Sequence, residues 1–174
     1  MSETRSRVPI IEGWFTDDVD APTLIGSKCP ACGTYVFPPR TGDCPSPICE
    51  STTLEPTPLS RRGKIWSYTE NRYAPPPPYV AADPYQPYAL AAVELADEGL
   101  VVLGRVATGI LAADLKVGME MQLELDVSHR DDEHEYIVYV WAPAAPASTA
   151  PVASTASTAP SPALPAPAPT EGGS

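Results

Sequence analysis

The 174-residue sequence lacks any long apolar run and contains little histidine and few basic residues. A membrane-spanning helix needs about eighteen or more consecutive apolar residues, so no such helix and no membrane partner are expected. The first residues, Met1 to Arg7, are polar and contain no apolar stretch of the kind that forms a secretory signal. These absences predict a cytoplasmic protein, in a reducing compartment where disulfides are rare.

The shortage of basic residues argues against a second class of partner. The chain has 11 Lys and Arg residues against 22 Asp and Glu residues, a formal net charge of −11. Proteins that bind nucleic acid gain much of their affinity from contacts between basic side chains and phosphates. We therefore expect no nucleic-acid partner.

Residues 142–174 consist mainly of alanine, proline, serine and threonine, and Glu171 is the only charged residue among them. Such a segment has few side chains worth burying, and its prolines interrupt any continuous helix. We predict a disordered C-terminal tail over 142–174. A role as spacer or solubility element is the alternative to no role at all.

Four cysteines occur in two pairs separated by eleven residues: Cys29 and Cys32, then Cys44 and Cys49. In a reducing compartment, closely paired cysteines favour metal binding over disulfides. Each pair can form a tight turn, and two facing turns bring four thiolates to one tetrahedral site for a single zinc ion. Because four sulfur ligands leave no coordination position open, the predicted zinc is structural rather than catalytic.

The predicted metal also has an energetic reason. Residues 22–60 are too few and too polar to fold by burial alone. Structural zinc contributes an apparent folding free energy on the order of 10 kcal/mol in small zinc modules. Iron in the same four-sulfur site, and four reduced cysteines without metal, are the alternatives.

Residues 61–141 carry the strand signals. Alternation is clearest after Gly118, where Met121 and Leu123 face one way while Glu120 and Gln122 face the other. Polar turns separate the apolar runs, and closing five short strands into a barrel would remove exposed edges. The sequence thus predicts a mainly β protein whose five-stranded barrel uses the following strands: Gly63–Tyr73, Tyr88–Leu95, Leu100–Thr108, Met119–Val127 and Tyr136–Trp141.

Helix is expected in only two short places. In the N-terminal segment, 1–21, Ile11, Trp14 and Phe15 follow helix-like spacing and predict a short helix that covers the ribbon or barrel. Between the third and fourth strands, residues 112–118 allow one helical turn at most, with Gly118 as its left-handed terminal residue.

Several short motifs follow one another in a specific order along the chain. Together they resemble the DUF35 family, the zinc-ribbon OB-fold proteins associated with thiolase-like enzymes. The resemblance spans Trp14 to Trp141, and the wide second cysteine pair departs from the commoner CxxC spacing. Besides the cysteines, the motifs are Phe37-Pro38-Pro39-Arg40, the stretch Arg62 to Thr69, Pro87-Tyr88, Val93-Glu94-Leu95 and the stretch Leu115 to Met119.

The resemblance implies a fold and a role. The fold is a rubredoxin-like zinc ribbon followed by an OB-fold barrel. The role is that of a non-catalytic accessory subunit, in a hetero-oligomer with a thiolase-like enzyme, a lipid-transfer-type thiolase or an aldolase. Such enzymes act on acyl-CoA substrates in lipid, steroid or aromatic side-chain metabolism, and the accessory subunit supports the partner and helps to bind acyl-CoA.

Candidate contact residues lie in and around the stiff segment Ala74 to Tyr88, rich in proline and tyrosine. Its tyrosines suit the buried centre of an interface, and nearby basic residues could meet acidic partner residues or the phosphates of coenzyme A. A simple inter-strand connection and solvated surface charges are the alternatives. The candidates are Tyr79, Tyr85, Tyr88, Arg61, Arg62, Lys64 and Arg72.

Two other functions remain to be weighed. OB-folds commonly bind single-stranded nucleic acid, but residues 61–141 contain seven basic and thirteen acidic residues, the wrong balance for a phosphate-tracking groove. An independent acyl-CoA hydrolase or transferase would need a nucleophile and a base. The only histidines, His129 and His134, flank an acidic turn and fit a solvated hairpin end better than a general base.

Overall fold

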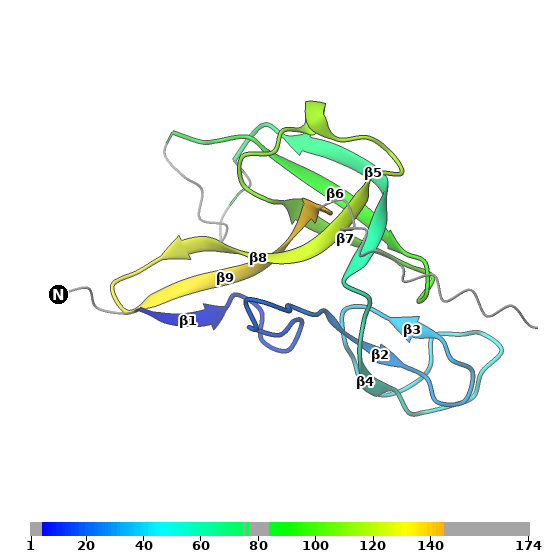
Figure 1. Cartoon of the computed structure of the whole chain (residues 1–174). Helices are drawn as coiled ribbons and strands as arrows, with labels where there is room; N and C mark the ends of the chain where they lie inside the picture. The colour runs from blue at the N-terminus through cyan, green and yellow to red at the C-terminus, as the bar shows by residue number, and fades with distance from the viewer. Residues whose placement is uncertain (1–4, 75, 77–83, 145–174) are drawn as a thin grey trace, which may run out of the picture.

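The computed structural model describes residues 5–74, 76 and 84–144 (Figure 1). Within these residues it is almost entirely β, and none of its helices is long and apolar enough to cross a membrane. The elements are β1 (Ser6–Pro9), β2 (Ile25–Lys28), β3 (Tyr35–Val36), β4 (Glu55–Pro58), β5 (Arg62–Asn71), β6 (Tyr88–Leu95), β7 (Leu100–Val106), the 3-10 turn η1 (Ala112–Asp114), β8 (Glu120–Arg130) and β9 (His134–Pro143).

Strands β5 to β9 close into a barrel. β6 pairs with β5 and β7, β8 pairs with β5 and β9, and a short parallel pairing of β7 with β9 completes the circle. The predicted five-stranded barrel is confirmed. Strand β9 runs two residues past the predicted boundary, so Ala142 and Pro143 belong to the barrel. The rest of the predicted tail, from residue 145, lies outside the described residues.

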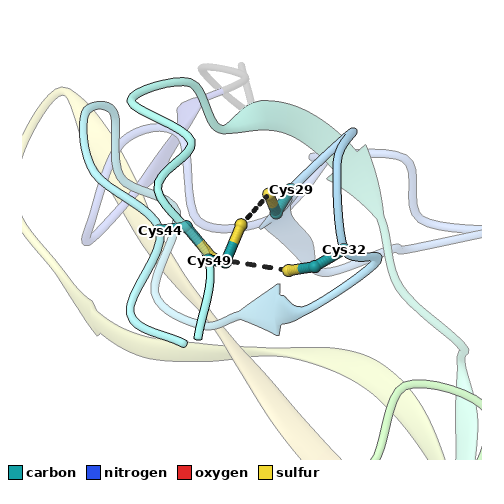
Figure 2. A group of neighbouring side chains, drawn as sticks. All are labelled: Cys29, Cys32, Cys44 and Cys49. Atoms are coloured by element: carbon teal, nitrogen blue, oxygen red, sulfur yellow. Dashed lines mark hydrogen bonds between the residues drawn. The ribbon is translucent and has the colours of Figure 1, made fainter. Parts of the chain in front are cut away.

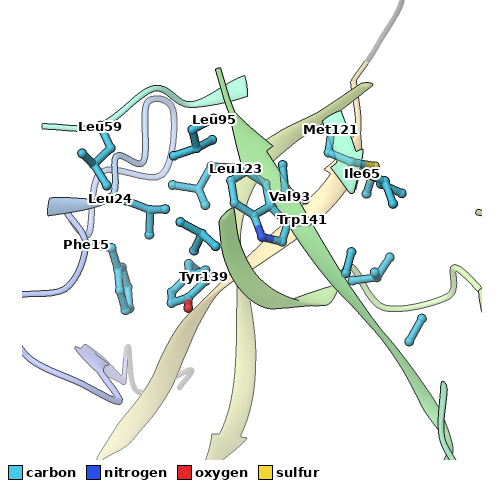
Figure 3. Close-up of a cluster of buried hydrophobic side chains, with 14 of the residues drawn as sticks. Phe15, Leu24, Leu59, Ile65, Val93, Leu95, Met121, Leu123, Tyr139 and Trp141 are labelled. Atoms are coloured by element: carbon cyan, nitrogen blue, oxygen red, sulfur yellow. The ribbon is translucent and has the colours of Figure 1, made fainter. Parts of the chain in front are cut away.

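The barrel interior is filled by the inward side chains of the alternating strands. Met121 and Leu123 of β8 are fully buried, as are Val93 of β6 and Ile65 of β5. At the centre, Trp141 lies against Gly104, where an added Cβ would come within 2.8 Å of the indole ring. Figure 3 shows these side chains gathered between the strands. The predicted alternation of β8 is therefore what builds the core.

The predicted N-terminal helix is wrong. Strand β1 instead runs parallel to β9, and the chain then turns at Gly13, whose φ of +79° is incompatible with a right-handed helix. Trp14 packs on Phe37 at 5.5 Å between ring centroids, and Phe15 packs on Tyr139 at 5.8 Å. The two rings are thus presented by an irregular turn between β1 and the bridge of Phe15 with Leu24, which the helix-like pattern alone does not distinguish.

The zinc-ribbon region forms a small separate sheet in the order β3–β2–β4. One side of it holds a cluster of Cys29, Cys44 and Leu54. Leu24, just before the central strand β2, and Leu59, just after β4, belong instead to the core of the barrel (Figure 3). The two regions share one apolar core, so the ribbon is stabilised by more than its metal site.

The turn after β8 provides a pH-dependent contact. The carboxylate of Asp131 accepts hydrogen bonds from the backbone N–H groups of Glu133, at 2.9 Å, and His134, and from the hydroxyl of Tyr136. These bonds, first that from Glu133, lower the pKa of Asp131 from 3.8 to about 2. Because the folded pKa is depressed, the contribution to stability is complete above pH ~4 and is lost as the pH falls through ~2.

We therefore expect the stability lost in Asp131→Asn to be constant above pH 5 and to shrink as the pH approaches 2. Urea unfolding at several pH values measures this difference. Asp132 accepts no hydrogen bond from another described residue, so Asp132→Asn is the matched control. A stability difference for Asp131→Asn that does not change with pH would refute this account.

Candidate metal centre and contact residues

The four cysteines sit on two turns that face each other at the end of the ribbon sheet (Figure 2). Strand β2 leads directly into Cys29, and the N–H of Gly33 closes the first turn on the carbonyl of Cys29 at 2.9 Å. In the second turn, the N–H of Cys49 bonds to the carbonyl of Ser46 at 3.1 Å. Both turns therefore project their sulfurs toward one point, as the paired spacing predicts.

The distances between the sulfurs suit one tetrahedral ion. All four Sγ atoms lie within 4.8 Å of one another, with Cys29 and Cys49 at 3.8 Å and Cys32 and Cys44 at 3.5 Å. Zinc–sulfur bonds of about 2.3 Å in a tetrahedron would separate the sulfurs by about 3.8 Å. The same distances are far too long for disulfides, and all four cysteines are free. The clustered donors are thus consistent with one structural zinc ion.

The thiol acidities also favour a bound cation. The backbone N–H of Cys32 lowers the pKa of Cys29 to about 6, although burial opposes the shift. For Cys44, the N–H of Ser46 acts in the same direction, but burial and the neighbouring Cys32 and Cys29 sulfurs prevail and raise the pKa to about 12. The thiol of Cys29 readily loses its proton, and its negative charge then opposes ionisation of the neighbouring thiols. Four thiolates become stable together only around a positive ion.

The six candidate contact residues that the structure describes do not form one site. Arg62 and Lys64 lie at the beginning of β5 and line an open cavity of about 510 Å³ together with three carboxylates. Arg61 there donates to the backbone carbonyl of Asp20 at 3.3 Å. Arg72 follows the other end of β5, where it pairs with Glu70. At about 3.3 Å per residue, the two ends are separated by roughly 30 Å along the ten-residue strand.

The candidate tyrosines Tyr85 and Tyr88 lie at the C-terminal end of β5, near Arg72. The hydroxyl of Tyr85 donates to the backbone carbonyl of Asn71 at 3.0 Å, and the Asn71 side chain donates to the hydroxyl of Tyr88. Desolvation, followed by the nearby Tyr88, raises the pKa of Tyr85. Tyr79 lies outside the described residues. Both described tyrosines are thus tied to the end of β5.

Another residue near the C-terminal end of β5, Arg105, was not identified from the sequence. Arg105 of β7 stacks on the ring of Tyr88, with its guanidinium carbon 4.4 Å from the ring centroid. The alternation of Val102, Gly104 and Val106 toward the core places Arg105 on the outside of the barrel. That alternation is the sequence signal which could have identified it.

Both histidines lie in the β8–β9 hairpin. His129 stacks on Tyr136 at 4.3 Å between ring centroids, and Nδ1 of His134 lies 3.5 Å from Asp131. All described cysteines belong to the metal cluster, so neither histidine has a cysteine nucleophile beside it. Both histidines contact side chains of the hairpin itself, Tyr136 and Asp131.

Comparison with known proteins places this architecture in a family. A DUF35 domain-containing scaffold protein of Pyrococcus furiosus is 36% identical over 116 residues, which cover 67% of this chain and 78% of that protein. The chain belongs to the DUF35 family. Two family models agree: the ChsH2 rubredoxin-like zinc ribbon domain matches residues 16–55, and the ChsH2 C-terminal OB-fold domain matches residues 56–126.

Two further relatives of this DUF35 chain are parts of enzymes. Benzoylsuccinyl-CoA thiolase subunit BbsA of Thauera aromatica is 44% identical over 54 residues, or 31% of this chain and 35% of that subunit. A solved structure of an Ltp2-ChsH2(DUF35) aldolase matches with a TM-score of 0.50 and 26% identity, covering 70% of this chain and 84% of the matched chain.

Proposed function

We propose that this DUF35 chain is a non-catalytic accessory subunit of a thiolase-like or aldolase enzyme that acts on acyl-CoA substrates. The partner is a thiolase, a lipid-transfer-type thiolase or a related aldolase, and it carries the reactive residues. The DUF35 chain supports this partner and contributes to the acyl-CoA site.

Family membership is the observation that carries the proposal. One relative is named as a subunit of a thiolase for a CoA thioester, another belongs to an aldolase that combines two proteins, and a third is named a scaffold protein. Two proteins similar to this chain are thus named as parts of a thiolase and of an aldolase, which supports an accessory role beside such an enzyme.

The geometry of the described residues supports an accessory role. We propose Cys29, Cys32, Cys44 and Cys49 as the zinc ligands, and a zinc ion held by four sulfurs has no position left for water or substrate. The histidines are held in the β8–β9 hairpin, away from the thiol cluster. Such a chain is suited to binding and positioning a partner enzyme rather than to making or breaking covalent bonds.

The alternative, a single-stranded nucleic-acid binder, is poorly supported. Ligands of OB-folds commonly bind the outer face of the second and third barrel strands, here β6 and β7. On that face the outward residues of the two strands are mainly apolar, and Arg105 is the only basic one. A phosphate-tracking groove needs several basic residues together with stacking aromatics.

Co-purification followed by activity measurement tests the proposal. We expect the tagged chain, expressed in its native cell, to elute with a thiolase-like or aldolase subunit. The isolated chain should not turn over acyl-CoA thioesters, whereas the complex should, with products followed by chromatography. Turnover by the isolated chain, or the absence of any such partner, would overturn the proposal.

Binding of single-stranded nucleic acid tests the alternative function. A fluorescence anisotropy titration with single-stranded oligonucleotides at physiological salt should show only weak binding. A salt-sensitive complex of submicromolar affinity would favour the alternative function.

A further inference from the structure

We propose that the outer face of β5, β6 and β7 is the surface that docks on the thiolase-like subunit, and that Arg105 there receives a carboxylate of that partner. This inference rests on the proposed function and assigns it a place on the molecule. We call this surface the barrel face and define it by its outward residues Lys64, Trp66, Ser67, Thr69, Leu90, Ala92, Glu94, Val101, Leu103 and Arg105.

The strand register aligns the barrel face in three rows. Figure 1 shows β5, β6 and β7 side by side in the barrel, and their pairing sets the neighbours. Because inward and outward side chains alternate along paired strands, each row lies on one side of the sheet. The rows are Lys64, Glu94 and Val101; then Ser67, Ala92 and Leu103; then Thr69, Leu90 and Arg105.

Large apolar side chains are exposed on this face, with Leu103 in its middle row. Leu103 is 59% exposed, Val101 is 49% exposed, and half-buried Leu90 and Ala92 lie beside them. Trp66, 62% exposed, is the extra residue in the β5 bulge between Ile65 and Ser67. A bulge sets two residues opposite one, here Trp66 and Ser67 opposite Ala92, so the indole joins the same face. An exposed apolar group of this kind marks an interaction surface.

Arg105 adds a specific charge requirement at the end of the face. Its Nε is buried and has no hydrogen-bond partner among the described residues, and no described carboxylate lies within ion-pair distance of it. Asp126 accepts hydrogen bonds from the side chain and backbone N–H of Thr108, three residues after Arg105. Stacking on Tyr88 holds the guanidinium beside a cavity of about 130 Å³. A carboxylate matches its planar donors best.

The exposed apolar side chains and Arg105 together indicate the kind of partner. Protein interfaces have an apolar centre with aromatic and arginine residues and a polar rim, and the barrel face has this composition. The occupant is therefore a segment of the thiolase-like subunit with apolar side chains to cover Trp66 and Leu103 and an Asp or Glu to reach Arg105. Lys64 and Glu94 lie at the opposite rim.

Calorimetry with the co-purified partner subunit tests this surface. Leu103→Asp places a charge in the apolar centre, and we expect the dissociation constant to rise at least tenfold. Val19→Asp is the matched control, because Val19 is 62% exposed but lies outside the barrel face, and it should bind like the parent. Zinc content and melting temperature, measured on the same samples, should stay at the parent values.

Salt dependence isolates the role of Arg105. We expect Arg105→Gln to weaken binding about tenfold and to reduce its sensitivity to salt, because one charge pair is lost. Parent-like binding by both Leu103→Asp and Arg105→Gln would overturn the barrel face while leaving the proposed function intact. Failure of the parent itself to bind any thiolase-like subunit would overturn both. A homodimer in sedimentation that Leu103→Asp dissociates would assign the face to a second copy instead.

Discussion

Replacing Cys32 with serine is expected to reduce the zinc content from about one ion per chain to nearly none, and to unfold the ribbon. A hydroxyl does not replace a thiolate as a zinc ligand at neutral pH, and structural zinc contributes apparent folding free energy on the order of 10 kcal/mol in small modules. Because Leu24 and Leu59 belong to the core shared with the barrel, the melting temperature of the whole protein should fall as well.

Cys32 is the best of the four positions for this test because its side chain is exposed, whereas Cys29 is fully buried. Loss of stability in Cys32→Ser therefore reports the metal rather than lost packing. The neighbouring exposed Ala31 provides the control: Ala31→Ser adds a hydroxyl but keeps every thiol. Elemental analysis and thermal unfolding are measured on both. Full zinc content or an unchanged melting temperature in Cys32→Ser would contradict the metal site.

Replacing Trp141 with alanine is expected to lower the free energy of unfolding by about 3–5 kcal/mol, the usual cost of removing a large buried aromatic side chain. Trp141 is completely buried and lies at the centre of the barrel core. Its indole Nε1 has no hydrogen-bond partner among the described residues, so its contribution comes from packing alone. Trp141→Phe keeps most of this packing and should cost less. Urea unfolding measures both changes.

A second variant tests whether the packing of Trp141 on Gly104 accounts for the stability lost in Trp141→Ala. Gly104→Ala places a methyl group within 3.0 Å of both Trp141 and Tyr139, so it should be destabilising alone. In the Trp141→Ala background part of this clash is removed, and the two changes should cost less together than their sum. Strict additivity, or a Trp141→Ala protein as stable as the parent, would show that the ring is not the centre of the core.

The local pattern of the sequence was sufficient for the barrel strands and the metal centre. Alternation of Met121 and Leu123 with polar neighbours needs only the two-residue period of a strand. The paired spacing of the cysteines likewise restricts where four sulfurs can meet. Both features depend on residues close together in the chain, so the sequence by itself determined the four-sulfur centre and the strands, while pairings such as β5 with β8 close these strands into the barrel.

Only the tertiary structure decided how distant segments meet. The spacing of Trp14 and Phe15 fits a helix, yet a strand followed by a turn is favoured because β1 can pair with β9 while Trp14 packs on Phe37 and Phe15 packs on Tyr139. Arg62 and Arg72 are near neighbours in the sequence, but an extended strand carries them to opposite ends. Ser67 lies on the same outward face as Trp66 because pairing with β6 introduces a bulge. These outcomes depend on long-range pairing and shared burial, which no local pattern in one chain contains.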